Sequence, residues 1–336
     1  MTDPQLVSDV RSGLGSYPKS LAPRWLYDDA GIILFDEITR LPEYYLTEAE
    51  RRLLDAHAAE VAKLSGARSI VELGAGTADK TMTLLQAFAD AGRLTSFVPL
   101  DVSTQALDLA AQRVRERFPR LPVVPHIADF SGYLPPAEDD DPRLVAFLGS
   151  TIGNFYADER RAFLEHVAAS LRPGDSLLLG TDLVKGADRL VRAYNDSQGV
   201  TERFVLNLLR VLNRELGAEF RIEDFDYAPL WDERQERMDL RLRSRRAHDV
   251  PVPGADMTVP FAAGEEIRVE ISTKFRLAGI ARELSDVGLE PVQAFADADF
   301  GLTLALQDQE PENGDQGQGR TADLPIFKPS RTSAVI

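Results

Sequence analysis

The sequence predicts an α/β protein in which helices cover both faces of a parallel sheet and a smaller α+β domain is inserted. Strand-like and helix-like segments alternate from residue 69 to 184, and the strands are almost continuously apolar, as in SIVEL and SLLLGTDLV. Such strands are typical of a parallel sheet that is buried on both faces. A glycine-rich turn follows the first strand directly. From about residue 185 the pattern changes, which favours a second domain.

The predicted elements follow in order along the chain. An aromatic-rich stretch before residue 48 predicts a short helix between two loops, and residues 48–64 carry apolar side chains at helical spacing. The elements expected next are a strand SIVEL, a helix at 79–91, a strand SFVPLDV, a helix at 103–117, a strand around VVPHIADF, a strand LVAFLGS, a helix at 157–171 and a strand SLLLGTDLV.

The segment after residue 185 predicts a long helix from Ala187 through Glu215, followed by strands. Alternation at 237–243 and 267–275 is typical of antiparallel strands with one open face. A final helix at 277–288 and the run FGLTLAL resemble the end of the first domain, so the second domain is an insertion. The predicted divisions are a first domain of 49–184 plus 274–306, a second domain of 1–48 plus 185–273, and a polar, disordered tail at 307–336.

Composition excludes several kinds of partner and site. The 336 residues include 38 Lys plus Arg and 54 Asp plus Glu, and a net charge of −16 would repel nucleic acid and anionic membranes. The absence of cysteine excludes disulfides and thiolate metal sites, and the four histidines lack zinc-site spacing, so we expect no metal. No run approaches ~20 apolar residues, and no signal peptide is evident. We expect a cytoplasmic protein that binds no nucleic acid and no membrane, and a monomer, because no exposed apolar stripe is obvious.

The strongest local motif is VELGAGTADK at residues 71–80, between a buried strand and a helix. Gly74 and Gly76 permit a sharp turn and close approach of a ligand at the carboxyl end of a strand. The pattern is not GxGxxG, and the acidic Glu72 together with Thr77 favours a phosphate-free ligand such as S-adenosylmethionine over NAD. A turn needed only for packing is the alternative.

Two acidic residues after later strands strengthen this interpretation. Asp101 ends the second strand, where a carboxylate accepts hydrogen bonds from ribose hydroxyls; the alternative is that it caps the next helix. Asp129 and Phe130 end the third strand, where a carboxylate accepts from an adenine amino group and an aromatic ring covers the base. By themselves these two residues also suit an ordinary junction between strand and loop.

Longer stretches carry a specific resemblance. They are PKSLAPRWLYD, LFDEITRLPEYY, VELGAGTADKT, FLGSTIGNF, LRPGDSLLLGTDLVK, RLVRAYND, GVT, LNRELGAEF and FAAGEE. From about Val10 to Leu306 the chain resembles the histidine Nα-methyltransferases of ergothioneine biosynthesis. These enzymes convert L-histidine to its trimethylammonium betaine, hercynine, by three methyl transfers from S-adenosylmethionine. The resemblance implies a Rossmann-like class I methyltransferase sheet with an inserted α+β substrate-binding domain.

The resemblance also implies roles for individual residues. The positions that line the S-adenosylmethionine site in the family are Gly74, Lys80, Asp101, Asp129 and Phe130, with Lys80 near the carboxylate of the methyl donor. The positions that bind the substrate are Tyr27, Tyr44, Asn154, Tyr194, Glu270 and Ser272. A pocket position that is methionine in some members of the family is Leu240 here. This apolar change conserves volume and should cost little free energy.

Methyl transfer from a sulfonium is an in-line displacement. The protein therefore needs to align the amine with the methyl group and to exclude water, but it need not supply a metal or a nucleophile. The attacking amine must be neutral, although a free α-amine is largely protonated near neutral pH. Asn154 suits the role of acceptor for the amine through its amide oxygen; the alternative is a turn residue after Gly153. Tyr27 is a second candidate, as a hydrogen-bond acceptor or as a base.

The remaining predicted residues suit the substrate's carboxylate and ring. Tyr44 and Tyr194 offer hydroxyl donors to a carboxylate; the alternative is packing at the domain boundary. Strand alternation places Glu270 and Ser272 on one face together with Arg268 and Lys274. Such a face is ordinarily solvated, whereas in the family it binds the two imidazole nitrogens.

Three other functions remain open: methylation of another amino acid or amine, an NAD-dependent oxidoreductase, and a non-catalytic nucleotide sensor. The leading hypothesis requires the N-terminal segment and the insertion to fold over the ligand edge of the sheet. Tyr27, Asn154, Tyr194 and Glu270 would then converge on one cavity beside Gly74.

Overall fold

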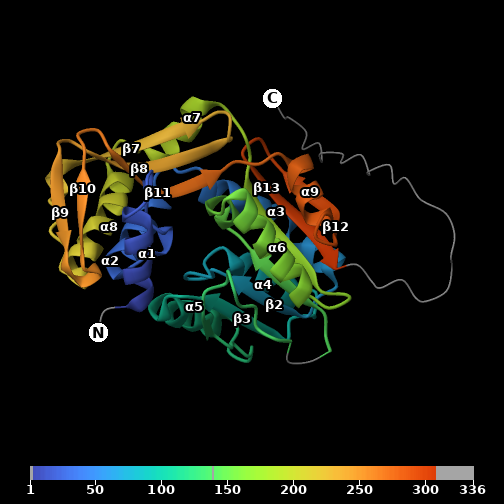
Figure 1. Ribbon diagram of the computed structural model, residues 1–336. Helices are drawn as coiled ribbons and strands as arrows, with labels where there is room; N and C mark the ends of the chain where they lie inside the picture. The colour runs from blue at the N-terminus through green and yellow to red at the C-terminus, as the bar shows by residue number, and fades with distance from the viewer. Residues whose placement is uncertain (1–2, 138–139, 308–336) are drawn as a thin grey trace, which may run out of the picture. The chain divides into compact units, whose positions relative to one another are not determined.

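The computed structural model describes residues 3–137 and 140–307, and these form two compact units (Figure 1). We call residues 3–47, 153–155 and 184–274 the α+β unit, and the rest of the described chain the α/β unit. The predicted tail lies, from residue 308 on, outside the described residues. The assignment of cofactor binding to one domain and substrate binding to the other stays a prediction.

The α/β unit is built on a sheet whose described strands run in the order β12-β13-β6-β5-β2-β3-β4. Strand β2 lies between β3 and β5 and is parallel to both, with Leu73 in register with Leu100 and with Phe147. Strand β13 is antiparallel to β6 and β12. The strands are β2 Ser69–Leu73, β3 Ser96–Asp101, β4 His126–Ile127, β5 Arg143–Phe147, β6 Ser176–Asp182, β12 Leu289–Ala296 and β13 Phe300–Gln307.

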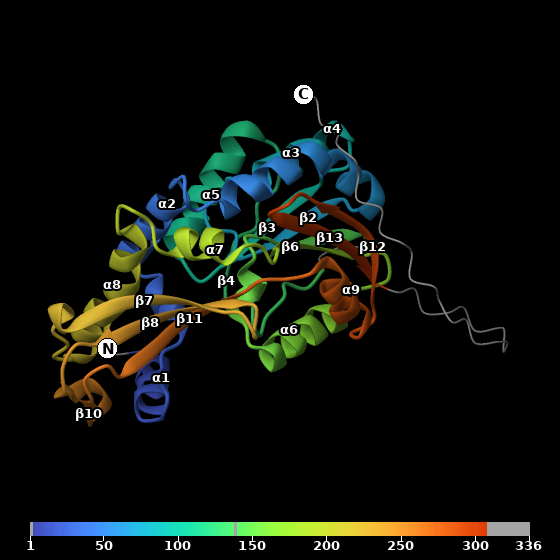
Figure 2. The ribbon, with the colours of Figure 1, turned by 90° about the horizontal axis from the view of Figure 1, so that it is seen from above.

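Helices cover both faces of this sheet. Figure 2 shows α3, α4 and α5 on one face and α6 and α9 on the other. The central strands are therefore buried on both sides, and every residue of β5 and β6 is buried, which explains their continuous apolar runs. The predicted Rossmann-like α/β fold is confirmed. The helices are α3 Leu46–Ser65, α4 Thr81–Asp90, α5 Thr104–Arg117, α6 Ala157–Ser170 and α9 Leu277–Ser285.

The α+β unit has a sheet with strand order β1-β11-β8-β7 and a hairpin of β9 and β10. Helix α8 packs against α2 and against β7 and β8 with one apolar side. The elements are α1 Pro4–Leu14, β1 Lys19–Ser20, η1 Pro23–Leu26, α2 Asp29–Ile38, α7 Ala187–Tyr194, α8 Val200–Leu216, η3 Ile222–Asp224, β7 Phe225–Asp232, β8 Arg237–Ser244, β9 His248–Val252, η4 Pro253–Ala255, β10 Met257–Phe261 and β11 Glu266–Thr273. In the described part of the chain no helix is long and apolar enough to cross a membrane.

The predicted single helix from Ala187 through Glu215 is wrong, because the chain breaks between α7 and α8. Gly199 adopts a left-handed φ of +65° there, a conformation that glycine reaches without strain. The carboxylate of Asp196 accepts hydrogen bonds from the backbone N–H groups of Val200 and Thr201, at 2.9 and 2.8 Å, which satisfies the start of α8.

Several other predicted bounds also differ from the structure. The strand expected around VVPHIADF is shorter than predicted and consists of β4 alone. Asp129 and Phe130 therefore lie in the turn that follows β4. The final helix ends at Ser285, because the chain turns at Gly288, with a φ of +83°, into a strand that the sequence pattern did not predict. Among the described α-helices and strands, those that the sequence pattern did not predict are α1, β1, β7, β9, β10 and β12.

Candidate active site

The glycine turn after β2 lies where the strand order reverses between β3 and β5, the usual ligand position in open α/β sheets. Gly74 and Gly76 have left-handed φ values of +66° and +51°. The backbone N–H groups of Gly74 and Ala75 donate to the carbonyl of Leu100 at 2.8 and 3.0 Å, which ties the turn to β3. A Cβ at Gly74 would stand 3.4 Å from Cε1 of Phe130, so this glycine brings the backbone close to an aromatic ring.

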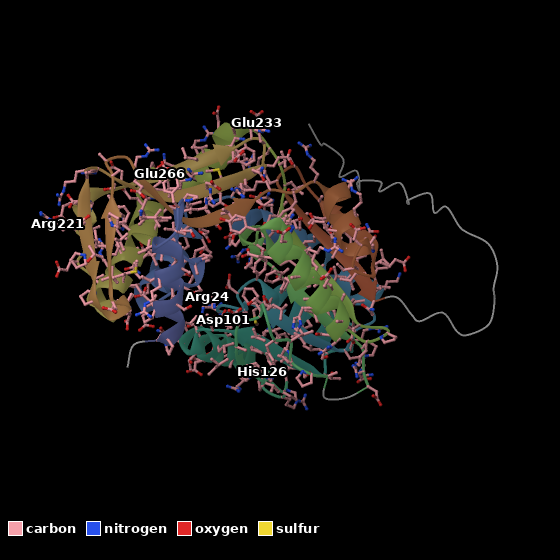
Figure 3. The ribbon with its side chains drawn as sticks, in the orientation of Figure 1. Arg24, Asp101, His126, Arg221, Glu233 and Glu266 are labelled. Carbon is pink, nitrogen blue, oxygen red and sulfur yellow. The ribbon has the colours of Figure 1, made fainter. Side chains whose placement is uncertain are left out.

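Asp101, labelled in Figure 3, is the last residue of β3. Its Oδ2 accepts from the backbone N–H of Gly76 at 2.9 Å, and its Oδ1 accepts from that of Ser103 at 2.9 Å. Ser103, and not Asp101, caps α5, since its Oγ accepts from the N–H of Ala106 at 3.1 Å. The helix-cap alternative for Asp101 is therefore wrong. Each carboxylate oxygen keeps a lone pair for a further donor.

Asp129 and Phe130 lie in the turn after β4. Asp129 Oδ1 accepts from the backbone N–H and from the hydroxyl of Ser131, at 2.9 and 2.7 Å, so the carboxylate is held in place by its own turn. The ring of Phe130 packs against those of Phe147 and Phe163, with centroid distances of 5.2 and 6.2 Å. The structure thus brings Phe130 beside Gly74 and Asp101 beside Gly76, and their role in cofactor binding stays a prediction.

Lys80 forms an ion pair with Glu50, a fully buried residue of α3. The other oxygen of Glu50 accepts from the backbone N–H of Gly149, just beyond β5, at 2.7 Å. Sequence reasoning missed Glu50, although a signal was present. Glu50 precedes the apolar residues Leu53 and Leu54 by three and four positions, and therefore shares the buried side of α3.

Glu72 is a second buried carboxyl group near the turn. The hydroxyl of Thr81 donates to its Oε1, whereas its Oε2 is buried with no hydrogen-bond partner among the described residues. Burial raises the pKa of Glu72 to about 8, with Thr81 and Lys80 acting in the opposite direction. No group of three or more His, Asp or Glu side chains in the described chain is placed to hold a metal ion.

In the α+β unit, Glu270 and Ser272 lie two positions apart on β11, with 9% and 5% exposure. Their register partners on β8 are Leu240 and Met238, which are fully buried. The solvated-face alternative is therefore wrong, because this face of the strand is covered. Leu240, the position at which the chain departs from some family members, is directly opposite Glu270.

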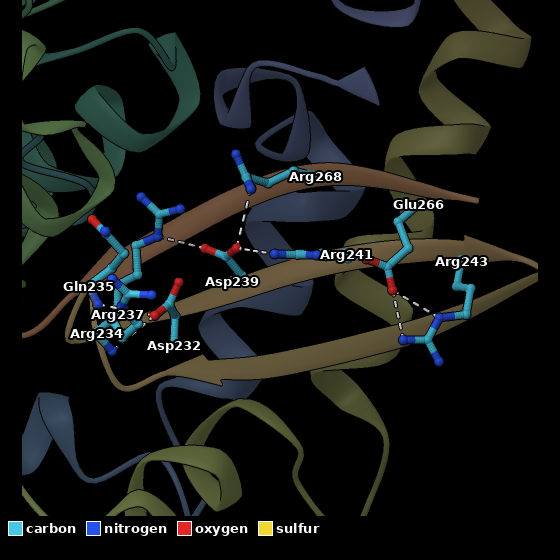
Figure 4. Close-up of polar contacts among 9 residues, drawn as sticks. All are labelled: Asp232, Arg234, Gln235, Arg237, Asp239, Arg241, Arg243, Glu266 and Arg268. Carbon is cyan, nitrogen blue, oxygen red and sulfur yellow. Dashed lines mark hydrogen bonds and ion pairs between the residues drawn. The ribbon is translucent and has the colours of Figure 1, made fainter. Parts of the chain in front are cut away.

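The expected alternation is wrong at Arg268, because the register of β11 shifts between Arg268 and Glu270. One extra residue at a bulge turns the following side chains to the other face of the sheet. Figure 4 shows the result: Arg268 points to the buried carboxylate of Asp239, as do Arg237 and Arg241. Asp239 thus holds three guanidinium groups on the face opposite Glu270.

Two hydrogen bonds connect the residues around β11. The amide Nδ2 of Asn154, in the 3-10 turn η2 (Thr151–Asn154) after β5, donates to Glu270 Oε1 at 3.0 Å. Burial raises the pKa of Glu270 to about 7, and the positive charge of Lys274 opposes that rise. The Oη of Tyr194 and the Oγ of Ser272 are 2.8 Å apart. Asn154 is therefore more than a turn residue, since its side chain reaches β11.

Aromatic rings join the predicted tyrosines. The ring of Tyr27 packs at 5.5 Å from that of Phe35, Phe35 at 6.4 Å from Tyr44, and Tyr44 at 6.1 Å from Tyr194, all edge to face. The ring of Phe204, on α8, also belongs to this cluster, because its centroid lies 5.3 Å from that of Tyr27. All six predicted substrate residues therefore lie in the α+β unit and are linked by contacts or by a shared strand face. Their convergence with Gly74 on one cavity stays a prediction.

Sequence reasoning also gave no role to Lys274 or Tyr227. Lys274 is 2% exposed, and its ammonium donates to Tyr194 Oη and to Ser272 Oγ, both at 2.7 Å. The Oη of Tyr227 donates to the backbone carbonyl of Tyr194 at 2.7 Å. The position of Lys274 two residues after Ser272 was the available signal.

Comparison with known proteins identifies the family. The family model "Histidine-specific methyltransferase, SAM-dependent" matches residues 6–308. The chain is 46% identical over 301 residues to the histidine N-alpha-methyltransferase of Mycolicibacterium smegmatis, covering 89% of this chain and 94% of that protein. It is 32% identical over 304 residues to ergothioneine biosynthesis protein 1 of Neurospora crassa, covering 85% of this chain and 33% of that protein. It is 29% identical over 322 residues to the L-tryptophan methyltransferase of Psilocybe serbica, covering 85% of this chain and 88% of that protein.

The family match extends over nearly all described residues of both compact units, so it concerns the whole fold and not the glycine turn alone. The resemblance identified in the sequence is thereby confirmed, as is the expectation of an enzyme that uses S-adenosylmethionine. The chain belongs to the histidine-specific, S-adenosylmethionine-dependent methyltransferase family.

Proposed function

We propose that this protein transfers methyl groups from S-adenosylmethionine to the α-amino nitrogen of L-histidine. Three successive transfers give hercynine, the first step of ergothioneine biosynthesis. The observation that supports this most is the buried pair of Glu270 and Ser272 on one face of β11, with Asn154 bound to the carboxylate of Glu270. A polar pair on a covered strand face suits a polar ligand, and an imidazole ring offers one nitrogen to each of the two side chains.

Glu270 and Ser272 bind the two ring nitrogens of histidine. A carboxylate at 9% exposure accepts a ring N–H, and an apolar substrate would leave that carboxylate desolvated and without this donor. Sites built to satisfy a polar substrate group reject analogues that lack it much more strongly than apolar pockets reject an extra methylene. Glu270 is therefore the main determinant of substrate choice.

Asn154 positions the α-amine for attack. Because its Nδ2 is engaged by Glu270, its Oδ1 is the atom that accepts an amine N–H and directs the nitrogen lone pair toward the methyl group. An amide does not titrate near neutral pH, so the same contact serves each round of methylation. Tyr27 assists as an acceptor or as a base during loss of the amine proton. Tyr44 and Tyr194 provide hydroxyl groups for the substrate carboxylate.

Residues at the carboxyl ends of β2, β3 and β4 bind the methyl donor, which supplies an activated methyl group on a sulfonium. The glycine turn fits this ligand, because any side chain at Gly74 would fill the space against Phe130. Asp101 accepts from the ribose hydroxyls with the lone pairs that Gly76 and Ser103 leave open. Asp129 accepts from the adenine amino group, Phe130 covers the ring, and Lys80 neutralises the carboxylate.

Displacement at a methyl carbon needs alignment and exclusion of water, and no metal is required. The proposal also includes the sequence-based expectations of a monomeric, cytoplasmic enzyme.

Mass spectrometry of the products tests the proposed reaction. The purified protein, incubated with S-adenosylmethionine and L-histidine, should yield histidine with one, two and finally three added methyl groups. Parallel incubations with L-tryptophan and other amino acids test the alternative, a methyltransferase of another amino acid or amine. Exclusive methylation of a different amino acid would overturn the proposal in favour of that substrate. Binding of the donor without any methylation would favour a sensor.

A pair of variants on β11 tests the assigned role of Glu270. Glu270→Ala should lower kcat/KM for histidine by about 100-fold or more, because the ring N–H loses its charged acceptor. Affinity for S-adenosylhomocysteine, measured by calorimetry, should remain unchanged. Glu266→Ala is the matched control, since Glu266 lies on the same strand and pairs with Arg241 and Arg243. Equal turnover by both variants would remove the case for ring recognition by Glu270.

A further inference from the structure

Glu50 is a fully buried carboxylate on α3 that binds the side chain of Lys80, the residue directly before α4. Helices α3 and α4 lie on the same face of the sheet of the α/β unit (Figure 2). One carboxylate oxygen, Oε2, accepts from the Lys80 ammonium, and the other, Oε1, accepts from the backbone N–H of Gly149 at 2.7 Å. Each oxygen of Glu50 is therefore engaged by a different donor.

The surroundings of Glu50 leave its carboxylate little freedom. A Cβ at Gly180, on β6, would stand 2.3 Å from Glu50 Oε1, so the backbone of the sheet lies directly against this oxygen. Gly149 has a left-handed φ of +76°, and Ser150 has a φ of +57°, which residues with a side chain rarely adopt. The Oγ of Ser150 accepts from the backbone N–H of Asp182 at 2.9 Å, which ties this turn to β6. Glu50 thus occupies a narrow and rigid position.

The side chain of Lys80 is flexible and depends on this contact for its position. It is 23% exposed, so water reaches it, and a lysine stem has several rotatable bonds. Among the described residues, the acceptor that holds its ammonium is Glu50. Without Glu50 the ammonium would turn to water or toward Glu72, the other buried carboxyl group, on whose pKa the charge of Lys80 acts. The ion pair therefore selects one conformation of Lys80 out of many.

Glu50 has two opposing effects on an anionic group that binds to Lys80. Its negative charge offsets the charge of Lys80 and weakens the attraction. Its hydrogen bond holds the ammonium in place, which removes the entropy cost of ordering a flexible side chain when the ligand binds. Water screens the attraction at a partly exposed residue but does not reduce the cost of ordering, so positioning is the larger effect.

We propose that Glu50 is a positioning residue that holds the ammonium of Lys80 in place for the carboxylate of the methyl donor. The inference rests on the proposed function, which assigns Lys80 to that carboxylate. It goes beyond that function because it makes affinity for one end of the donor depend on a residue that acts only through another. Glu50, whose two oxygens are engaged, does not itself touch the donor.

Two ligands isolate this effect. S-Adenosylhomocysteine has the carboxylate of the methyl donor, whereas S-adenosyl-3-thiopropylamine is the same molecule without the carboxylate. The dissociation constant of the second ligand divided by that of the first gives the preference for the carboxylate, and calorimetry on the full chain measures both constants. A defect in folding would weaken both ligands and leave this preference unchanged. The natural protein should bind S-adenosylhomocysteine more tightly.

Variants of the ion pair should lower the preference for the carboxylate. Glu50→Gln should lower it about tenfold, which is the affinity equivalent of ordering one flexible side chain. Glutamine has one amide oxygen, so either Lys80 or Gly149 would face its NH2 group. Lys80→Met should lower the preference at least as much, and the double variant no further than Lys80→Met alone. Glu60→Gln, at an exposed site on α3, is the control and should leave the preference unchanged.

Three results would overturn the inference. An unchanged preference in Glu50→Gln would show that Glu50 serves folding only, and a higher preference would show that Glu50 merely neutralises Lys80. An unchanged preference in Lys80→Met would show that Lys80 does not meet the carboxylate, so that Glu50 has nothing to act through. These measurements do not involve histidine. Failure of the proposed reaction would leave histidine unmethylated with these affinities intact, so the two failures are distinguishable.

A measurement on the natural protein tests the inference even if Glu50→Gln does not fold. Nitrogen-15 relaxation of lysine ammonium groups reports their mobility, and the chain has few lysines to assign. In the ligand-free protein the Lys80 ammonium should be much more restricted than that of Lys63, which is exposed on α3. Equal mobility of the two groups would overturn the inference, because Lys80 would then not be held in place before the donor binds.

Discussion

The amide of Asn154 donates a hydrogen bond of 3.0 Å to the carboxylate of Glu270, although 116 positions separate the two residues in the chain. This contact joins the group assigned to the amine with the group assigned to the ring. Orientation of the nucleophile and recognition of the side chain are therefore coupled through one hydrogen bond, and a change at Asn154 also affects Glu270.

Replacement of Asn154 should impair the chemical step. Asn154→Ala removes the amine acceptor and the donor to Glu270, and a misaligned nucleophile costs about 100-fold in kcat. Steady-state kinetics with histidine measures the effect. Asn213→Ala is the control, because Asn213 makes two hydrogen bonds to the backbone of Phe220 within the same unit and should affect stability only. A normal kcat in Asn154→Ala would refute the assigned role.

Substitution of Gly180 on β6 should be harmful, because a side chain at this position would collide with Glu50. A Cβ at Gly180 would lie 2.3 Å from Glu50 Oε1 and 3.2 Å from Cε1 of Phe300. Gly180→Ala should therefore displace Glu50 and its partner Lys80, cost about 1–3 kcal/mol of stability, and weaken binding of S-adenosylhomocysteine. Urea unfolding and calorimetry measure the two effects.

Gly279→Ala is the control for that substitution. A Cβ at Gly279 meets no atom within 4 Å and lies inside α9, where alanine is the better helix former. This variant should be as stable as the natural protein or more so, with unchanged ligand affinity. Equal behaviour of the two alanine variants would count against the role given to Glu50.

The buried Glu72 should make stability depend on pH. Because burial raises its folded-state pKa from 4.5 to about 8, the native state binds more protons than the unfolded chain between these values. Stability therefore falls as pH rises through that window, by at most about 1.4 kcal/mol per unit. Glu72→Gln removes this loss, so its advantage over the natural protein should be larger at pH 8 than at pH 5.

Urea unfolding of the ligand-free proteins at the two pH values measures this difference. Glu60→Gln removes the same charge from an exposed site on α3 and should show no such pH dependence. If the advantage of Glu72→Gln were the same at both pH values, Glu72 would titrate normally in the folded protein.

Asp239 should be essential for the stability of the α+β unit. Asp239→Ala leaves Arg237, Arg241 and Arg268 around a vacated buried position, and loss of one member of a buried ion cluster costs about 3–5 kcal/mol. Asp226→Ala is the control, since its ion pair with Arg245 is half exposed and, screened by solvent, contributes little to stability. Thermal and urea unfolding of both variants provides the comparison.

Sequence patterns predicted the α/β unit better than the α+β unit. The run SIVEL matches the bounds of β2, because a strand buried on both faces is mostly apolar and can be recognised without knowledge of its partners. Strand β11 is different. Its local alternation grouped Arg268 with Glu270, and a shift in pairing with β8 separated them. Pairing register depends on both strands and leaves no local signal.

The sequence by itself determined the alternation of strands and helices from β2 to β6, the glycine turn at Gly74 and the family to which the chain belongs, because these follow from local periodicity and contiguous motifs. Only the tertiary structure decided which polar side chains meet. The contact of Asn154 with Glu270, the hydrogen bonds of Lys274 and the burial of Glu50 join or enclose residues from distant segments. Hydrogen bonds act over about 3 Å between atoms of fixed direction, so such partners are specified only once the backbone is folded.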